Sequence, residues 1–173
     1  MSANFLSRSV LVAALCGLAC GCGTDYGWRS TVPSDRRTVY VPTFRNESEV
    51  VELGAIATRQ IARELQREGT FRLAGADAAA LEVQGTIRSA KGASNAYDRR
   101  TRLRMASYDM TAEAVVSVID RRTRKVLVDN RRYTAQATFT AGQDKTTALR
   151  DASGRLMDDL SRQVVDDMLN LKF

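Results

Sequence analysis

Two stretches of sequence decide the fold: LEVQGTIRSA at residues 81–90 and YDMTAEAVVSV at residues 108–118. In both, apolar residues occupy every second position, and mostly polar residues stand between them. Because successive side chains of a β-strand point to opposite faces, this period of two predicts strands with one buried and one wet face. The buried set is Leu81, Val83, Gly85 and Ile87 in the first stretch, and Tyr108, Met110, Ala112, Ala114, Val116 and Val118 in the second.

Further strands flank these two. The polar turn Asp120–Lys125 leads into a third alternating stretch, residues 126–139. Upstream, Thr38–Phe44 is rich in β-branched and aromatic residues and is predicted to be a strand, with Pro42 at a sheet edge or a strand end because proline cannot donate to a ladder. Two smaller features are also expected, a polar turn at Arg45–Ser48 and a short strand at Phe71–Leu73.

Two segments have helical spacing instead. The first carries Leu53, Ala57, Ile61 and Leu65 at intervals of four and is expected to end at Gly69. The second is Thr146–Leu171, in which Leu149, Leu156, Leu160, Val164 and Met168 share one face. The apolar face of such a sheet must be buried against other elements, and these two helices are expected to pack on it. The predicted fold class is therefore α+β, a two-layer sandwich of two helices on a mostly antiparallel, mixed sheet of about four strands.

The N-terminal residues predict a lipoprotein signal. Arg8 precedes an apolar run, Val10–Leu18, that is too short to cross a membrane. The small and apolar residues 18–21 then precede Cys22 in the pattern typical of a bacterial lipidation site. We expect a signal peptide at residues 1–21 and lipidation at Cys22, with Cys20 as the alternative acylation site. Residues 22–36 lack periodicity and are expected to be a tether, and residues 37–173 one domain.

Composition narrows the function classes. The 173 residues contain no histidine, so the commonest general base and metal ligand is missing. Lipidation of Cys22 would also leave no free thiol after cleavage, and no phosphate-cradling glycine loop is present. We therefore expect no catalytic residue, no metal and no cofactor, although a periplasmic enzyme of another type stays open. The net charge of +6 favours acidic partners, and export makes nucleic acid an unsuitable one.

The predicted topology gathers the basic residues at two ends of the sheet. If the three long strands run up, down and up, the loop 91–103 and the connection 140–145 fall at the same end. That end would hold Lys91, Arg99, Arg100, Arg102, Arg104 and Lys145. Arginine can hold phosphate or carboxylate oxygens in a bidentate manner, so this group is a candidate polyanion site. The opposite turn holds Arg121, Arg122, Arg124 and Lys125, for which a simple solvated turn is the preferred interpretation.

The order of short motifs resembles the LptE family of lipopolysaccharide-assembly lipoproteins. The motifs are Gly21-Cys22-Gly23, V-x-V-P-x-F-R-N at Val39–Asn46, E-L-Q-R-E-G at Glu64–Gly69, L-x-V-x-G-x-I from Leu81, Tyr-x-Met at Tyr108, and D-x-x-T-x-K at Asp120–Lys125. One departure is that Thr24-Asp25 intervenes before the aromatic Tyr26. The resemblance covers nearly the whole chain after the signal.

The resemblance implies a location, partners and a binding role. It implies a lipid-anchored protein on the periplasmic side of the outer membrane that sits inside an LptD β-barrel, stabilises it and helps deliver lipopolysaccharide to the outer leaflet. In that family, lipid A phosphates are thought to meet basic residues near one end of the domain, which by position are those of the loop 91–103 and Lys145. The alternative is a lipoprotein activator or scaffold of periplasmic cell-wall synthesis.

Overall fold

The computed structural model describes residues 32–97, 106–141 and 145–172. A short 3-10 turn, η1 (Ser34–Arg36), precedes the first strand. The strands are β1 (Thr38–Tyr40), β2 (Arg45–Asn46), β3 (Arg72–Leu73), β4 (Leu81–Tyr97), β5 (Ala106–Asp120) and β6 (Val126–Ala141). The helices are α2 (Leu53–Glu68) and α3 (Lys145–Leu169). Within these ranges, no helix is both long and apolar enough to span a bilayer.

All six strands belong to one mixed sheet. Its order is β3-β1-β4-β5-β6, with β2 pairing with β4 beyond the end of β1. The long strands β4, β5 and β6 form an antiparallel meander, whereas β1, β2 and β3 pair in parallel. The α+β sandwich is confirmed, but the expectation of about four strands was too low. The two-residue strands β2 and β3 are too short to show a period in the sequence.

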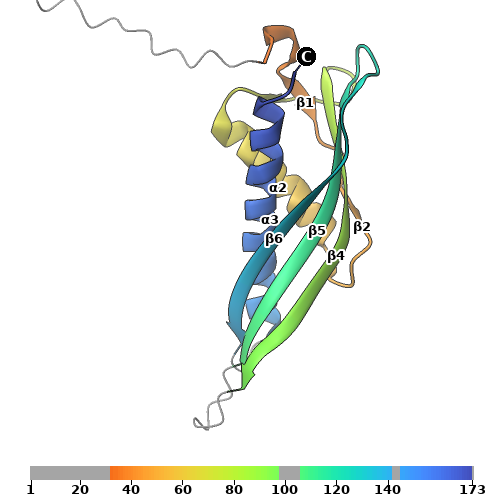
Figure 1. The fold of residues 1–173 in the computed structure, drawn as a ribbon. Helices are drawn as coiled ribbons and strands as arrows, with labels where there is room; N and C mark the ends of the chain where they lie inside the picture. Colours follow the sequence, from red (N-terminus) through yellow and green to blue (C-terminus); the bar gives the residue numbers. More distant parts are fainter. Residues whose placement is uncertain (1–31, 98–105, 142–144, 173) are drawn as a thin grey trace, which may run out of the picture.

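Both helices cover the same face of the sheet, as Figure 1 shows. Most of the apolar residues predicted for β4, β5 and the two helices are buried in one core, from Leu81 and Ile87 to Leu156 and Met168, and Tyr108 and Leu149 pack against it half-buried. The helix predicted to end at Gly69 does so, because this glycine adopts the left-handed conformation (φ 85°) and its N–H donates to the carbonyl of Leu65. The opposite face of the sheet has no helix of the described chain on it.

Phe44 docks the first strands onto the helical layer. Its ring lies over Gly85, and its carbonyl oxygen lies against Gly54 of α2; a Cβ at either glycine would come within 2.0–2.3 Å of Phe44 atoms. The Phe44 N–H donates to the hydroxyl of Thr58 (2.9 Å), which donates to the carbonyl of Gly54 (2.8 Å). Between the ladder pairs of β1 and β2, the chain is therefore held by the contacts of Phe44 with two glycines and one hydroxyl.

Three sequence predictions need correction here. The strand expected at Thr38–Phe44 ends at Tyr40, and Pro42 lies just after it, as proposed for a strand end; β1 itself is an interior strand. The turn expected from Arg45 was wrong in part, because Arg45 and Asn46 pair with Thr86 and Ile87. The first long strand continues to Tyr97, so much of the expected loop 91–103 is strand β4.

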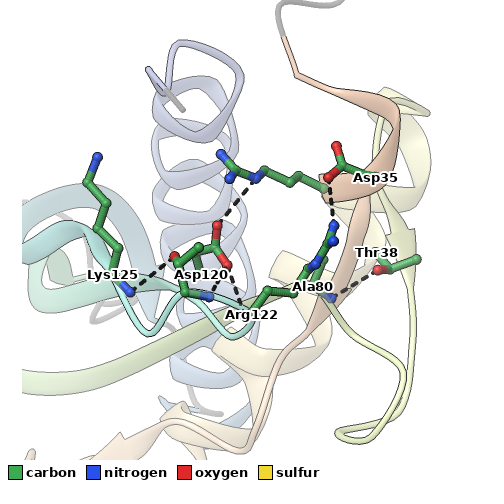
Figure 2. Close-up of polar contacts among 8 residues, drawn as sticks. Asp35, Thr38, Ala80, Asp120, Arg122 and Lys125 are labelled. Atoms are coloured by element: carbon green, nitrogen blue, oxygen red, sulfur yellow. Dashed lines mark hydrogen bonds and ion pairs between the residues drawn. The ribbon is translucent and has the colours of Figure 1, made fainter.

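The last residues of the expected tether, from Val32 to Arg36, are fixed to the domain near the turn between β5 and β6. Val32 is buried, and its carbonyl accepts from the Arg37 guanidinium (3.2 Å). The buried Asp120 carboxylate accepts from the N–H groups of Arg122 and Thr123 (2.9 and 3.0 Å) and pairs with Arg36 (3.3 Å). Arg122 also pairs with Asp35 (2.6 Å). The contacts of Asp120 and the Asp35–Arg122 pair, which Figure 2 shows, are hereafter called the Asp120 clamp.

Candidate functional site

The strand register defines the two ends of the sheet. At one end Tyr97 pairs with Ala106, and Ala106 pairs with Ala141. The C-terminal end of β4, the start of β5 and the C-terminal end of β6 therefore lie side by side. We call this the distal end. At the other end, Leu81 pairs with Asp120 beside the Asp120 clamp, and we call this the tether end. The long axis of the molecule runs between the two (Figure 1).

Only part of the predicted polyanion group can be located. Lys91 lies exposed on β4, six residues before the strand ends, and Lys145 begins α3 just after the distal end. The backbone therefore brings the neighbourhoods of Lys91 and Lys145 to the same end, as predicted. The four arginines of that group lie outside the described residues: Arg99, Arg100, Arg102 and Arg104.

A groove of about 810 Å³ lies beside Lys91 at the distal end. Its apolar lining comes from Val50, Ala90, Tyr108, Phe139 and Leu149. Tyr108 and Phe139 are register partners on β5 and β6, and their rings stack with centroids 5.2 Å apart. The volume falls in the range of sites that hold small ligands. We call this groove the distal trough.

The distal trough forms because β4 has small residues at this end and because α2 does not extend over this part of the sheet. Ala90 and Gly92 lie on the helical face of β4, and a Cβ at Gly92 would meet only Asp109 O, at 4.0 Å. Helix α2 begins at Leu53, after a loop whose residues 47–50 line one side of the trough. The sheet face beyond that loop is therefore covered by α3 but not by α2.

The loop that forms one wall of the distal trough is held by Asn46, the last residue of β2. The Asn46 amide donates to the Val50 carbonyl (2.9 Å), and its oxygen accepts from the backbone N–H and the hydroxyl of Ser48 (3.1 and 2.7 Å). Glu47 is paired with Arg88 (2.6 Å). This pair neutralises Arg88 locally, whereas Lys91 has no ion-pair partner within the described ranges.

The apolar residues of the distal trough were missed as site residues. Tyr108, Phe139 and Leu149 all belong to apolar patterns and were assigned to the core. Periodicity shows which face of a strand or helix is apolar, but it does not show where the covering layer ends. The signal available in the sequence was the pair of small residues, Ala90 and Gly92, which follow the larger Ile87 on the same face of the strand.

The described residues hold no group of three or more acidic, cysteine or histidine side chains that could bind a metal. The same residues contain no buried side-chain nitrogen or oxygen without a hydrogen-bond partner. The buried carboxylate of Asp120 is used by the clamp. What the described part of the distal end offers is a groove with an apolar floor, lined also by two acids and two bases: Glu47, Glu49, Arg88 and Lys91.

A family model for LptE, described as lipopolysaccharide-assembly, matches residues 36–169. The chain belongs to the LptE family. The resemblance drawn from the order of the motifs is thereby confirmed. LptE proteins are lipoproteins of the outer membrane that take part in lipopolysaccharide assembly, and the family is not an enzyme family.

Solved structures agree with the fold of this LptE protein. It is similar to a hypothetical protein from Chlamydia trachomatis (14% identity, 78% of this chain and 96% of that one, TM-score 0.52). It is also similar to a neuraminyllactose-binding hemagglutinin homologue from Helicobacter pylori (10% identity, 79% and 84% covered, TM-score 0.50). At such identities the likeness concerns the fold alone. No curated protein sequence matches the chain.

Proposed function

We propose that this LptE protein is lipidated at Cys22, is held on the periplasmic side of the outer membrane, and plugs and stabilises an LptD-type β-barrel while assisting lipopolysaccharide insertion into the outer leaflet. The observation that carries the proposal is the family match over residues 36–169, which takes in every strand and both helices. The proposed division is a signal peptide at 1–21, a tether at 22–36 and the domain at 37–173. Val32–Arg36, at the end of this tether, pack against the domain.

The helix-free face of the sheet supports a barrel partner. Its side chains are mainly hydroxyls, amides and charged groups, namely Gln84, Thr86, Asp109, Thr111, Glu113, Ser117, Arg132, Thr134, Gln136 and Thr138. Neighbouring groups are linked across the strands, as in the Arg132–Glu113 pair (3.3 Å) and the Thr138–Asp109 hydrogen bond (2.7 Å). The interior of an outer-membrane barrel is also polar, so the two surfaces match in chemistry.

The distal end supports a lipopolysaccharide role. Lipid A combines phosphate groups with acyl chains, and the distal end combines cations with an apolar trough. We assign the phosphates to the basic group predicted from the sequence: Lys91, Arg99, Arg100, Arg102, Arg104 and Lys145. The distal trough, with Tyr108, Phe139 and Leu149, is the apolar surface beside Lys91 and is assigned to an acyl chain.

Site-specific photocrosslinking in outer membranes tests the barrel partner. A photoreactive residue at Gln136, on the helix-free face, is expected to give an adduct that mass spectrometry identifies as an LptD-type barrel. The matched control is Asp77, which is also exposed but lies at the tether end and is expected to give no barrel adduct. An adduct with a cell-wall transglycosylase would support the activator or scaffold alternative. Absence of a barrel adduct at Gln136 would reject the plug.

A further inference from the structure

We infer that the tether end of this protein docks on the headgroups of anionic phospholipids, in the leaflet that holds the lipid anchor. This membrane contact is separate from the lipopolysaccharide site at the distal end. The inference depends on the proposed function in one respect only, namely which leaflet holds the lipid anchor. The surface consists of Arg37, Arg72, Arg124, Lys125 and Lys172, which we call the basic collar.

The fold brings these residues to one end from separate parts of the chain. The register sets Thr38 beside Arg72, Val39 beside Leu73 and Leu81, and Leu81 beside Asp120. The turn that carries Arg124 and Lys125 follows Asp120 directly, and the Asp120 clamp ties it to η1. Figure 1 shows the C-terminal end of α3 at this same end of the molecule.

The basic collar has more positive charge than its neighbours neutralise. Arg36, Arg121 and Arg122 are each paired with an acid: Asp120, Glu82 and Asp35. The five collar cations have no ion-pair partner among the described residues, and four of them are exposed, with Arg37 half-buried. Close to the collar residues in sequence are the exposed acids Asp77 and Asp129 and the half-buried Glu68. An excess of unpaired cations in a folded, exposed surface attracts anionic lipid phosphates.

Arg124 adds a second, independent observation. Its backbone is left-handed (φ 57°), a conformation that costs a long side chain energy and that glycine or asparagine adopts more easily. A turn built for stability alone would not need arginine there. Strained positions of this kind concentrate at functional sites, where another interaction offsets the cost.

Exposed aliphatic side chains accompany the cations. Among the described residues, three large hydrophobic side chains are exposed: Val51, Leu73 and Val126. Leu73 and Val126 both lie at the tether end, on the outer strands β3 and β6. Cations together with aliphatic groups form the combination that binds the interface of a bilayer, where the apolar side chains enter the headgroup region.

The length of the tether favours this orientation. Nine residues separate Cys22 from Val32, and at about 3.5 Å per residue they span at most about 35 Å. Strand β5 has 15 residues, so the sheet extends about 50 Å from the tether end to the distal end. A domain fastened through Val32 is therefore unable to stand with its distal end on the same leaflet. The tether end is the nearer one.

Vesicle binding without the anchor tests the inference. The protein from residue 22 onward with Cys22→Ser is expected to bind phosphatidylcholine vesicles that contain phosphatidylglycerol, to bind pure phosphatidylcholine weakly, and to dissociate as salt is added. The double variant Arg124→Asn/Lys125→Gln is expected to bind the mixed vesicles about tenfold or more weakly, since each cation near the surface contributes roughly fivefold. Its melting temperature should be unchanged or higher, because asparagine suits the left-handed position.

The matched control is Arg150→Gln/Arg155→Gln, which removes the same charge from two exposed residues in the distal half of α3. It should bind like the parent protein. Equal loss in both double variants would mean that net charge alone drives binding, and it would overturn the inference. Equal binding to the two kinds of vesicle, or full binding by the collar variant, would do the same. A missing barrel adduct at Gln136 would instead reject the plug and leave this vesicle result standing.

Discussion

At the scale of single residues, Gly85 controls how the first strands join the sheet. The Phe44 ring occupies the space where a Gly85 side chain would stand, 2.0 Å from the position of a Cβ. Phe44 is itself buried, so it has no free space to move into. A glycine inside a strand is here the consequence of close packing rather than of a turn.

We predict that Gly85→Ala destabilises the protein by about 1–3 kcal/mol, the usual cost of overpacking a filled core. Chemical denaturation of the variant and the parent protein measures this difference. Gly75→Ala is the control, because Gly75 is exposed and a Cβ there meets nothing within 4 Å. Equal stability of the Gly85 variant and the control would show that Phe44 repacks freely.

At the scale of elements, the Asp120 clamp joins η1 to the turn between β5 and β6. Burial disfavours the charged form of the Asp120 carboxyl, but the N–H groups of Thr123 and Arg122 and the charge of Arg36 outweigh it. The pKa of Asp120 therefore lies below its ordinary value of 3.8. A depressed pKa means that the clamp contributes its full stability above the ordinary value and loses it as the pH falls through the folded value.

We predict that the melting temperature of the parent protein falls as the pH is lowered from about 5 to 3, and that Asp120→Asn removes part of this dependence. At neutral pH the variant should lose about 2–3 kcal/mol, because Arg36 and two backbone donors lose a charged acceptor. Asp35→Asn serves as the control, since the exposed Asp35–Arg122 pair contributes about 1 kcal/mol or less. The same pH dependence in Asp120→Asn and the parent protein would contradict this role.

Most of the elements could be predicted from sequence, because their apolar periods are long. Strands β4, β5 and β6 carry clear alternation, and α2 has both a helical stripe and a terminal glycine. Strand β2 could not be predicted, since two residues cannot display a period and its pairing with Thr86 and Ile87 is a tertiary contact. The extension of β4 to Tyr97 was missed because Gly92, Ser94 and Asn95 disfavour strands by local preference.

Only the charged half of the candidate site was predicted from the sequence, and anion binding by these residues stays a prediction. The grouping of Lys91 and Lys145 follows from counting strand directions, which the register confirms. The distal trough depends on where α2 begins relative to β4, and no local pattern encodes that offset. The basic collar shows the same division. Arg124 and Lys125 could be seen in the sequence as part of one turn, but Arg72 and Lys172 come close to them only through the fold.

At the scale of the whole molecule, we propose a separate binding role for each end. Replacing Arg99, Arg100, Arg102 and Arg104 together by glutamine is expected to weaken lipopolysaccharide binding by more than tenfold and to reduce its salt dependence. The melting temperature should not change. Equilibrium binding to purified lipopolysaccharide measures the effect, with Arg150→Gln/Arg155→Gln as the charge control. Unchanged binding by the quadruple variant would reject the distal cations as the phosphate site.

A second variant separates the apolar part of the same site. Leu149→Glu places a charge in the distal trough, at a position that is already partly exposed, so the fold should tolerate it. Binding of lipopolysaccharide is expected to fall, while binding of a soluble phosphorylated sugar without acyl chains should not. Loss of both would indicate that Leu149 acts through the fold instead of through an acyl chain.

The long-range character of the Asp120 clamp has a consequence for the order of folding. Asp35 and Arg122 are 87 residues apart, whereas β4, β5 and β6 are consecutive hairpins. Local contacts form first, and closing a long loop is slow. The contacts of the clamp cannot form until β5 and β6 have paired and their turn exists. The segment that carries η1 should therefore become ordered last. In a newly exported chain, the segment that carries η1 would then stay mobile after the sheet has folded. This delay gives the domain time to find its partner before that segment is fixed.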